Sequence, residues 1–359
     1  MSARGFSLME AMSALAIAGV IIGGSTGAVM NINRLIADTS KRTAAWDEAK
    51  RLEEFLIART QGAGGGALRP HASVFVENAG GAAPPAIPPS TGGMGCRAIT
   101  GLPVCTAADQ GADRLTLMEQ VTNFPQCPVT GTSGVNLDIG AGASACCLND
   151  AAGGAASWDG VQALLVGNNG LVASVRLNSP NVSGPNCKVV APPGQGAGVL
   201  PTALAAVGVG TLVVVTASTI FVDGPAHTLS QWSDTNGNGS AEIGEITLIH
   251  DRVYDLQMAM GYDGLPENGA VVDANSSSDE FLFNHASDAT MPGNGNFVTV
   301  TTPQLRILQI AVAVGTPSQI SGGNSVQLLN RSAPISFPGV YLTQTASKAF
   351  MRNLNLFTQ

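Results

Sequence analysis

Residues 234–245 read DTNGNGSAEIGE and place oxygen-bearing side chains at the spacing of a cation-binding loop. The segment fits the pattern D-x-[DN]-x-[DN]-G-x5-E, in which the glycine makes a sharp turn and the last glutamate binds through both carboxylate oxygens. Because oxygen-only ligands favour Ca2+ over zinc or copper, the sequence predicts a calcium site. The expected ligands are the side chains of Asp234, Asn236, Asn238, Glu242 (directly or through water) and Glu245, and the backbone carbonyl of Ser240.

The flanks of this loop do not resemble the helices of an EF-hand. AHTLSQW before it and ITLIH after it read as strands, so an Asn- and Gly-rich hairpin loop without a cation is the alternative. Two asparagines in place of aspartates lower the ligand charge. We therefore expect the weak affinity of extracellular calcium modules, with a dissociation constant of about 10⁻⁴ to 10⁻³ M.

The six cysteines all lie between residues 96 and 187. An even number at irregular spacing is typical of a disulfide framework, which forms in an oxidising compartment. The pairing is open, and a zinc site or buried thiols are the alternatives, although no C-x-x-C spacing is present. The adjacent Cys146 and Cys147 are expected to have different partners, because a bond between neighbours strains the backbone. The disulfide candidates are Cys96, Cys105, Cys127, Cys146, Cys147 and Cys187.

Glu10 lies at the start of a long apolar segment, where a carboxylate needs an explanation. Residues 11–33 carry no charge, and a helix of roughly 20 residues is enough to cross a hydrocarbon core of about 30 Å. A carboxylate inside a membrane costs on the order of 3 kcal/mol unless it is paired. Glu10 therefore either has a charge partner there or reaches water at the interface.

The residues Arg4-Gly5-Phe6-Ser7-Leu8-Met9-Glu10 before this apolar run resemble the class III signal of type IV prepilins. The resemblance implies that prepilin peptidase cuts between Gly5 and Phe6 on the cytoplasmic side and N-methylates Phe6. The apolar helix then stays in the mature protein. In that family the carboxylate at the position of Glu10 meets the new terminal amine of a neighbouring subunit, which supplies the charge partner.

The helical pattern continues beyond the apolar segment. An apolar stripe at helical spacing, which we expect to pack on the body, consists of Trp46, Ala49, Leu52, Phe55 and Leu56. A helix from Phe6 to about Arg59 would be roughly 80 Å long at 1.5 Å per residue. Gly62 and the glycines at 64–66 are expected to end it.

The rest of the chain reads as strands and turns, because only 12% of residues are charged while Gly (44) and Pro (20) are frequent. Partial alternation favours an antiparallel sheet with one covered face, packed on the second half of the helix. We therefore expect an α+β fold with long disulfide-bearing loops. The expected strands are 72–78, 114–121, 161–167, 171–178, 211–223, 245–263 and 305–314.

Two further segments resemble PilW-like minor pilins. Residues 246–273 are similar to a segment in which a V-x-D-L-Q strand leads to a Gly-Tyr/Val-Asp turn, and residues 346–357 are similar to the Arg- and Asn-rich ends of large minor pilins and pseudopilins. The cysteine-rich middle resembles no family. The residues that match the first pattern are Val253, Asp255, Leu256, Gln257, Gly261 and Asp263.

The resemblance implies a minor pilin that primes assembly of a type IV pilus and sits at or near its tip. The implied partners are other minor pilins, the major pilin, a PilY-type tip adhesin, prepilin peptidase and the inner-membrane assembly platform. The implied location is the inner membrane before assembly, then the periplasm-spanning pilus and the cell surface. The alternatives are a minor pseudopilin of a type II secretion system and a calcium-dependent pilus-tip adhesin.

The expected organisation is a leader at residues 1–5, a pilin helix at 6–60 (about 6–33 transmembrane) and a body at 61–359. The body contains a cysteine-rich insertion at 90–190 and the calcium-type loop at 234–245. A formal net charge of -8 and a sequence pI of about 4.9 disfavour nucleic acid as a partner. The four histidines are scattered and no catalytic motif is present, so we expect no enzyme and no catalytic residues.

Overall fold

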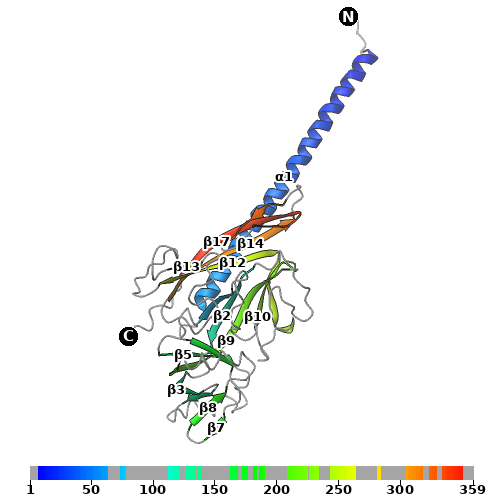
Figure 1. Cartoon of the computed structure of the whole chain (residues 1–359). Helices are drawn as coiled ribbons and strands as arrows, with labels where there is room; N and C mark the ends of the chain where they lie inside the picture. The colour runs from blue at the N-terminus through cyan, green and yellow to red at the C-terminus, as the bar shows by residue number, and fades with distance from the viewer. Residues whose placement is uncertain are drawn as a thin grey trace.

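The computed structural model combines one long apolar N-terminal helix with antiparallel β-sheets, an α+β arrangement (Figure 1). The residues that the structure describes are 7–63, 73–77, 112–121, 126–133, 136–139, 162–168, 172–176, 181–183, 186–190, 208–224, 226–233, 243–263, 281–283, 304–317, 323–329 and 334–350.

Helix α1 spans Leu8–Gly62, close to the predicted limits. Ser7 is its N-cap in an extended conformation, and Ser7 and Glu10 form a reciprocal capping box that satisfies two free N–H groups. The helix ends at Gly62, and the N–H of Ala63 donates to the carbonyl of Thr60 at 3.3 Å. The predicted end at the glycine-rich segment is therefore confirmed.

A four-stranded antiparallel sheet packs against the second half of α1 (Figure 1). Its strand order is β13-β12-β14-β17. The strands are β12 (Val253–Asp263), β13 (Phe281–Phe283), β14 (Gln304–Pro317) and β17 (Val340–Phe350).

A second, larger antiparallel sheet extends away from the N-terminus (Figure 1). The 14-residue strand β9 (Gly210–Asp223) is its centre, because β2, β3, β5 and β10 all pair with it. The other strands are β1 (Val74–Glu77), β2 (Arg114–Gln120), β3 (Cys127–Ser133), β4 (Asn136–Ile139), β5 (Gln162–Gly167), β6 (Val172–Arg176), β7 (Asn181–Ser183), β8 (Asn186–Val190), β10 (Thr228–Ser233) and β11 (Ile246–His250).

The main core lies where α1 meets both sheets. Ala49, Leu52 and Leu56 of the helix pack with residues of β2 and β9 from the larger sheet and of β12 and β14 from the smaller one. One apolar cluster therefore joins the three parts. Backbone bonds reinforce it: the N–H of Asp113 donates to the carbonyl of Leu256 at 2.8 Å.

The predicted single strand at 245–263 is wrong, because the chain changes sheets within it. β11 pairs with β10 in the larger sheet, whereas β12 pairs with β13 and β14 in the smaller one. Arg252, between them, has a φ of 57°, in the left-handed region that turns a chain sharply. A short helix η4 (Ile243–Glu245) precedes β11.

The predicted single covered face of the sheet is also wrong. Ala311, Ala313 and Leu342 point to the face away from α1 and are buried against β15 (Ser325–Val326) and β16 (Ile335–Ser336). The reason is visible in ILQIAVAV, where the apolar run is continuous rather than alternating, as in strands buried on both faces.

Two of the five residues in the predicted helix stripe are not buried. Ala49, Leu52 and Leu56 are in the core, but Trp46 is 50% and Phe55 is 39% exposed. At about 100° per residue, these two aromatics lie on opposite sides of the line through Ala49 and Leu56. Helical spacing alone therefore predicted a wider buried stripe on the helix than the body covers.

Candidate functional site

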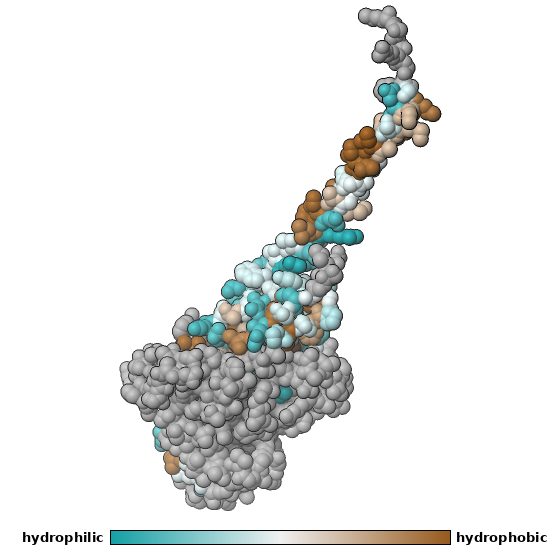
Figure 2. All heavy atoms as spheres, turned by 45° about the horizontal axis from the view of Figure 1, so that its top comes forward, coloured by the Kyte–Doolittle hydropathy of each residue, from teal (hydrophilic) through white to brown (hydrophobic). Residues whose placement is uncertain are grey.

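The first half of α1 projects from the body with every side chain exposed from residue 7 to residue 37. It is the one helix in the described part of the chain that is long and apolar enough to cross a membrane. Figure 2 shows its apolar side chains gathered along the projecting rod. Exposed apolar area costs about 25 cal/mol per Å² in water, so this surface needs a cover other than the body.

The hydroxyl groups within the apolar segment bond to the helix itself. Ser25 and Thr26 both donate to the carbonyl of Ile22, at 3.0 and 2.8 Å, and Ser13 donates to the carbonyl of Glu10 at 3.0 Å. Such bonds to the preceding turn satisfy the side-chain donors without water. The segment can therefore enter a hydrocarbon layer without unpaired hydroxyl donors.

Glu10 lies in the first turn of α1 and its carboxylate folds back onto the chain. Oε2 accepts the backbone N–H of Ser7 at 3.0 Å, and the Ser7 hydroxyl accepts the N–H of Glu10 at 3.3 Å. The carboxylate is exposed and points toward the N-terminal end of the helix, where its charge also complements the helix dipole. The predicted processing residues Gly5 and Phe6 lie outside the described residues.

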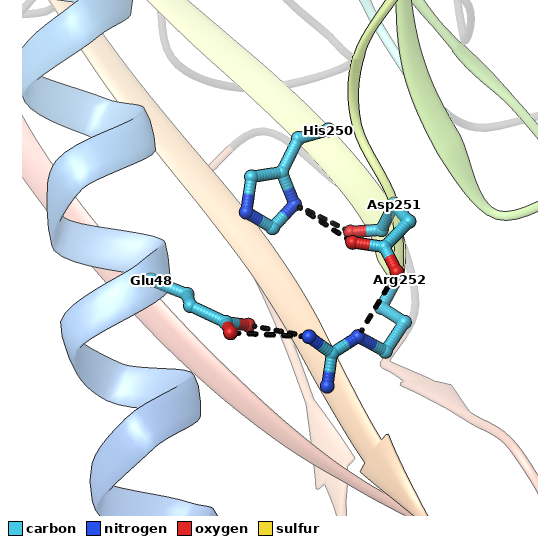
Figure 3. A network of polar contacts seen from close by, with 4 residues as sticks. All are labelled: Glu48, His250, Asp251 and Arg252. Carbon is cyan, nitrogen blue, oxygen red and sulfur yellow. Dashed lines mark hydrogen bonds and ion pairs between the residues drawn. The ribbon is translucent and has the colours of Figure 1, made fainter.

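A polar network fixes α1 to the turn between the two sheets (Figure 3). Arg252 donates from one nitrogen to both Glu48 oxygens, at 3.1 and 3.0 Å, and its Nε lies 3.4 Å from Asp251. The Nδ1 of His250 contacts Asp251 in turn. The left-handed turn at Arg252 aims its guanidinium at the helix, a contact that sequence spacing does not reveal because the partners are 204 residues apart.

Two carboxylates of α1 are buried against the body. Asp38 is 4% and Glu53 is 1% exposed, and within the described part of the chain neither carboxylate accepts a hydrogen bond. A buried charge without a partner costs several kcal/mol. Among the described residues, the helix–body contact thus contains two buried carboxylates without a hydrogen-bond partner beside its apolar groups.

An aromatic cluster lies on the face of the smaller sheet away from α1. The ring of His227 stacks on Tyr254 with a centroid distance of 4.2 Å, and Phe337 packs edge-on against His227 at 5.1 Å. Burial raises the pKa of the Tyr254 hydroxyl, and the charge of Arg252 partly offsets this. A side chain at Gly315 would overlap the Tyr254 ring, so the glycine is required here.

The predicted calcium loop connects β10 and β11, which pair as the sequence indicated, with Trp232 opposite Ile246. Of the expected ligands, Asp234, Asn236, Asn238, Ser240 and Glu242 lie outside the described residues. Glu245 is buried, and its Oε2 accepts the indole N–H of Trp232 at 3.1 Å. This hydrogen bond therefore holds the Glu245 carboxylate at the base of the β10–β11 hairpin. No group of three or more His, Cys, Asp or Glu that could hold a metal occurs among the described residues.

The cysteine-rich insertion contributes strands that sequence patterns did not reveal. Cys127 begins β3 and is buried, and Cys187 lies in β8 opposite Ile139. The predicted long loops are thus interrupted by β3, β4, β7 and β8. The other four candidates, Cys96, Cys105, Cys146 and Cys147, lie outside the described residues.

Comparisons with known proteins give no relative: no protein-family model, curated protein or solved structure matches the chain. The site must therefore be interpreted from its geometry. The first half of α1 is apolar and exposed, with a carboxylate in its first turn. The second half of α1 packs on the β-rich body through apolar and charged contacts.

Proposed function

We propose that this chain is a minor pilin that primes type IV pilus assembly and sits at or near the pilus tip. The observation that carries the proposal is α1 itself: its first half is apolar and uncovered, while its second half packs on an antiparallel sheet. Such a helix suits insertion first among lipids and then among the helices of neighbouring subunits. The prepilin-like residues Gly5, Phe6 and Glu10 add to this support.

The proposed mechanism is assembly. Prepilin peptidase removes residues 1–5 and methylates Phe6, and the chain waits in the inner membrane as a single-pass protein. The assembly platform then extracts it, and the body caps or adapts the filament end with other minor pilins, the major pilin and a PilY-type tip adhesin. The exposed carboxylate of Glu10 meets the terminal amine of a neighbouring subunit, an ion pair that is stronger in a low-dielectric surrounding than in water.

The test separates the charge of Glu10 from its capping role. Glu10→Val removes both, whereas Glu10→Gln keeps a side chain that can cap the Ser7 N–H but has no charge. Both variants should be processed normally, and both should be recovered in sheared filaments at a small fraction of the wild-type amount. Recovery of the glutamine variant at the wild-type level would show that only helix capping matters and would contradict the intermolecular pair.

The nearest competing function is a minor pseudopilin of a type II secretion system, which would use the same helix and a similar body. Deletion of the gene separates the two, since a pilin reduces surface pili and a pseudopilin reduces secretion. Both should be assayed in the same strain. Unchanged pili with lost secretion would overturn the pilin proposal.

A calcium-dependent tip adhesin is the second candidate, and the arrangement of the larger sheet favours it. Strands β3, β7 and β8 of the cysteine-rich insertion lie at the end opposite to the N-terminus (Figure 1), where a tip subunit would meet a surface. Removal of residues 140–161 should then abolish adhesion while the number of pili stays normal. Loss of pili instead would assign the insertion to assembly.

Calcium binding by the loop at 234–245 is part of this proposal. The proposed ligands are Asp234, Asn236, Asn238, Ser240, Glu242 and Glu245. Because Glu245 accepts the Trp232 indole N–H, coordination by Glu245 should change the fluorescence of Trp232. Millimolar calcium should raise the melting temperature and alter this fluorescence, and Asp234→Ala should remove both effects. Identical melting curves with and without calcium would eliminate the site.

A further inference from the structure

Three basic residues lie on α1 where its apolar half approaches the body. Arg34 directly follows the uncharged segment at 11–33, and Lys41 and Arg42 lie about 10.5 and 12 Å further along the helix axis. Arg34 and Arg42 are exposed and Lys41 is half-buried. Figure 2 shows hydrophilic side chains on the projecting helix just before it reaches the body. We call these three residues the basic cluster.

The basic cluster has no acidic partner in the described part of the chain. Neither Arg34 nor Lys41 forms an ion pair with any described residue. Arg42 lies over the ring of Tyr341, with a distance of 4.0 Å from its guanidinium carbon to the ring centroid. This contact leaves the positive charge in place, and the N–H donors at the edge of the guanidinium can still bind an anion.

The carboxylates of the helix are kept away from this cluster. Between Glu10 and Asp47 the sequence contains one carboxylate, that of Asp38, which is 4% exposed and accepts no hydrogen bond within the described chain. Asp47 lies about 9 Å beyond Lys41 along the axis and about 120° around it. This stretch of surface therefore has an excess of positive charge, although the chain as a whole has a formal net charge of -8.

Exposed apolar side chains lie in the same stretch of helix. Leu35 is 60% and Ile36 is 61% exposed, so their burial in a hydrocarbon layer would place the edge of that layer at about their level. Arg34 would extend its charged group along the helix to the interface. The headgroup layer is about 5–8 Å thick on each side of a bilayer. The long side chains of Lys41 and Arg42, about 8–9 Å beyond Ile36, can therefore reach its phosphates.

We propose that the basic cluster binds the phosphate groups of anionic phospholipids at the membrane surface from which the body projects. Its position favours a lipid over an acidic protein segment, because the cluster directly follows the apolar segment. Arg34 and Lys41 also lie only about 20° apart around the helix, so both face the same headgroups. The inference rests on the proposed function only for the single-pass membrane state of the chain before assembly.

The experiment uses the full-length chain in phosphatidylcholine bilayers that contain a trace of spin-labelled lipid. The motionally restricted fraction of the label, measured by electron spin resonance, gives the relative affinity of the protein for phosphatidylglycerol and phosphatidylcholine. The wild-type chain should prefer the anionic lipid at least about fivefold at low salt, since each basic residue near an anionic surface strengthens binding by about that factor. Arg34→Gln/Lys41→Gln and about 1 M salt should each remove most of this preference.

Two double variants control for total charge and for structure. Lys50→Gln/Arg51→Gln removes the same charge at about 13–15 Å beyond Lys41, which is more than a Debye length, and should keep the preference. Arg34→Lys/Lys41→Arg keeps the charges in place and should also keep it. Arg42 is left unchanged, because it also contacts the body.

Equal affinity of the wild-type chain for the two lipids, a preference that survives high salt, or an equal loss in the two glutamine double variants would each overturn the proposal. A preference that appears only when several chains share a bilayer would assign the cluster to contact between copies and would also overturn it. The measurement requires membrane insertion but neither cleavage nor a filament. Failure here is therefore distinguishable from failure of the pilin proposal, which the Glu10 variants test.

Discussion

The two halves of α1 share one continuous backbone but meet different surroundings. From residue 38 onward the helix buries Ala45, Ala49, Leu52 and Leu56 in the body, whereas from residue 7 to residue 37 it buries nothing. The exposed half is the more apolar one, and the packed half contains two buried carboxylates, Asp38 and Glu53. Apolar content alone therefore does not decide which part of a helix packs on its own domain.

The two halves of α1 are therefore suited to different surroundings. The second half follows the rule for a globular protein, with one apolar side against a sheet and charges elsewhere. The first half is apolar all round, which is typical of a helix that lies in lipid or among other helices. Leu56→Ala and Leu15→Ala compare the two halves directly, and the other variants test contacts of the packed half and of the body.

The largest expected effect is that of Leu56→Ala. Leu56 is 0% exposed in the core that joins the helix to both sheets, so its truncation should lower the free energy of unfolding by about 2–5 kcal/mol. Leu15→Ala, at a position that is 74% exposed, should leave the unfolding of the body unchanged. Equal effects in urea unfolding would show that the two halves are not energetically distinct.

Glu53→Gln should stabilise the body. The substitution replaces a buried carboxylate, which accepts no hydrogen bond within the described chain, by a neutral side chain of the same shape. The gain in the free energy of unfolding should be on the order of 1 kcal/mol or more. The neighbouring Glu54→Gln, at an exposed position, should change it by less than about 0.5 kcal/mol. A destabilised Glu53 variant would mean that the carboxylate has a partner in the folded protein.

Glu48→Gln should have a smaller effect of the opposite sign. The Glu48–Arg252 pair is partly exposed, with side-chain exposures of 32% and 40%, so its loss should cost about 0.2–1 kcal/mol. The difference from wild type should shrink in high salt, because exposed charges are screened. Asp47→Asn is the matched control on the exposed side of the helix. If it lowers the free energy of unfolding as much as Glu48→Gln does, the Glu48–Arg252 pair makes no specific contribution to stability.

The smallest effect concerns alkaline pH and Tyr254. Burial raises the pKa of its hydroxyl above the ordinary value of 10.0, so the folded chain keeps the proton at a pH at which the unfolded chain has lost it. The contribution of Tyr254 is complete below pH 10 and is lost as the pH rises further. Unfolding measured between pH 9 and pH 11 should show a decline that Tyr254→Phe reduces. A decline of equal slope in the variant would contradict this role.

Much of the fold could be predicted from the sequence, because its strongest signals are local. The uncharged run at 11–33 predicts the projecting helix, and the glycines near 62 predict its end. Strands β1, β2, β5, β6, β9 and β14 each lie in a segment of apolar residues bounded by turns. These features depend on neighbours within a few residues.

The rest depends on tertiary contacts that have no local signature. The break at Arg252 follows from the change of sheet and is stabilised by Glu48, 204 residues away. β17 lies at residues with mixed polarity and is fixed by β14. Asp38 and Glu53 have the residue types of an exposed helix surface, yet they are buried.

The candidate site was partly accessible to sequence reasoning. The structure agrees with the sequence on two points. Glu10 lies at the start of the helix, and strands flank the loop at 234–245 and pair as a hairpin. The polar network of Glu48 and Arg252, the ring cluster around Tyr254 and the contact of Arg42 with Tyr341 were missed, because each needs two or more segments that are distant in the sequence.

The most direct test of the pilin proposal is the intact mass of the mature protein isolated from cell envelopes. The proposal predicts a chain that begins at Phe6, carries one added methyl group on its terminal amine and retains the whole apolar half of α1. A mass that includes residues 1–5, or one that shows removal of the apolar segment, would contradict it.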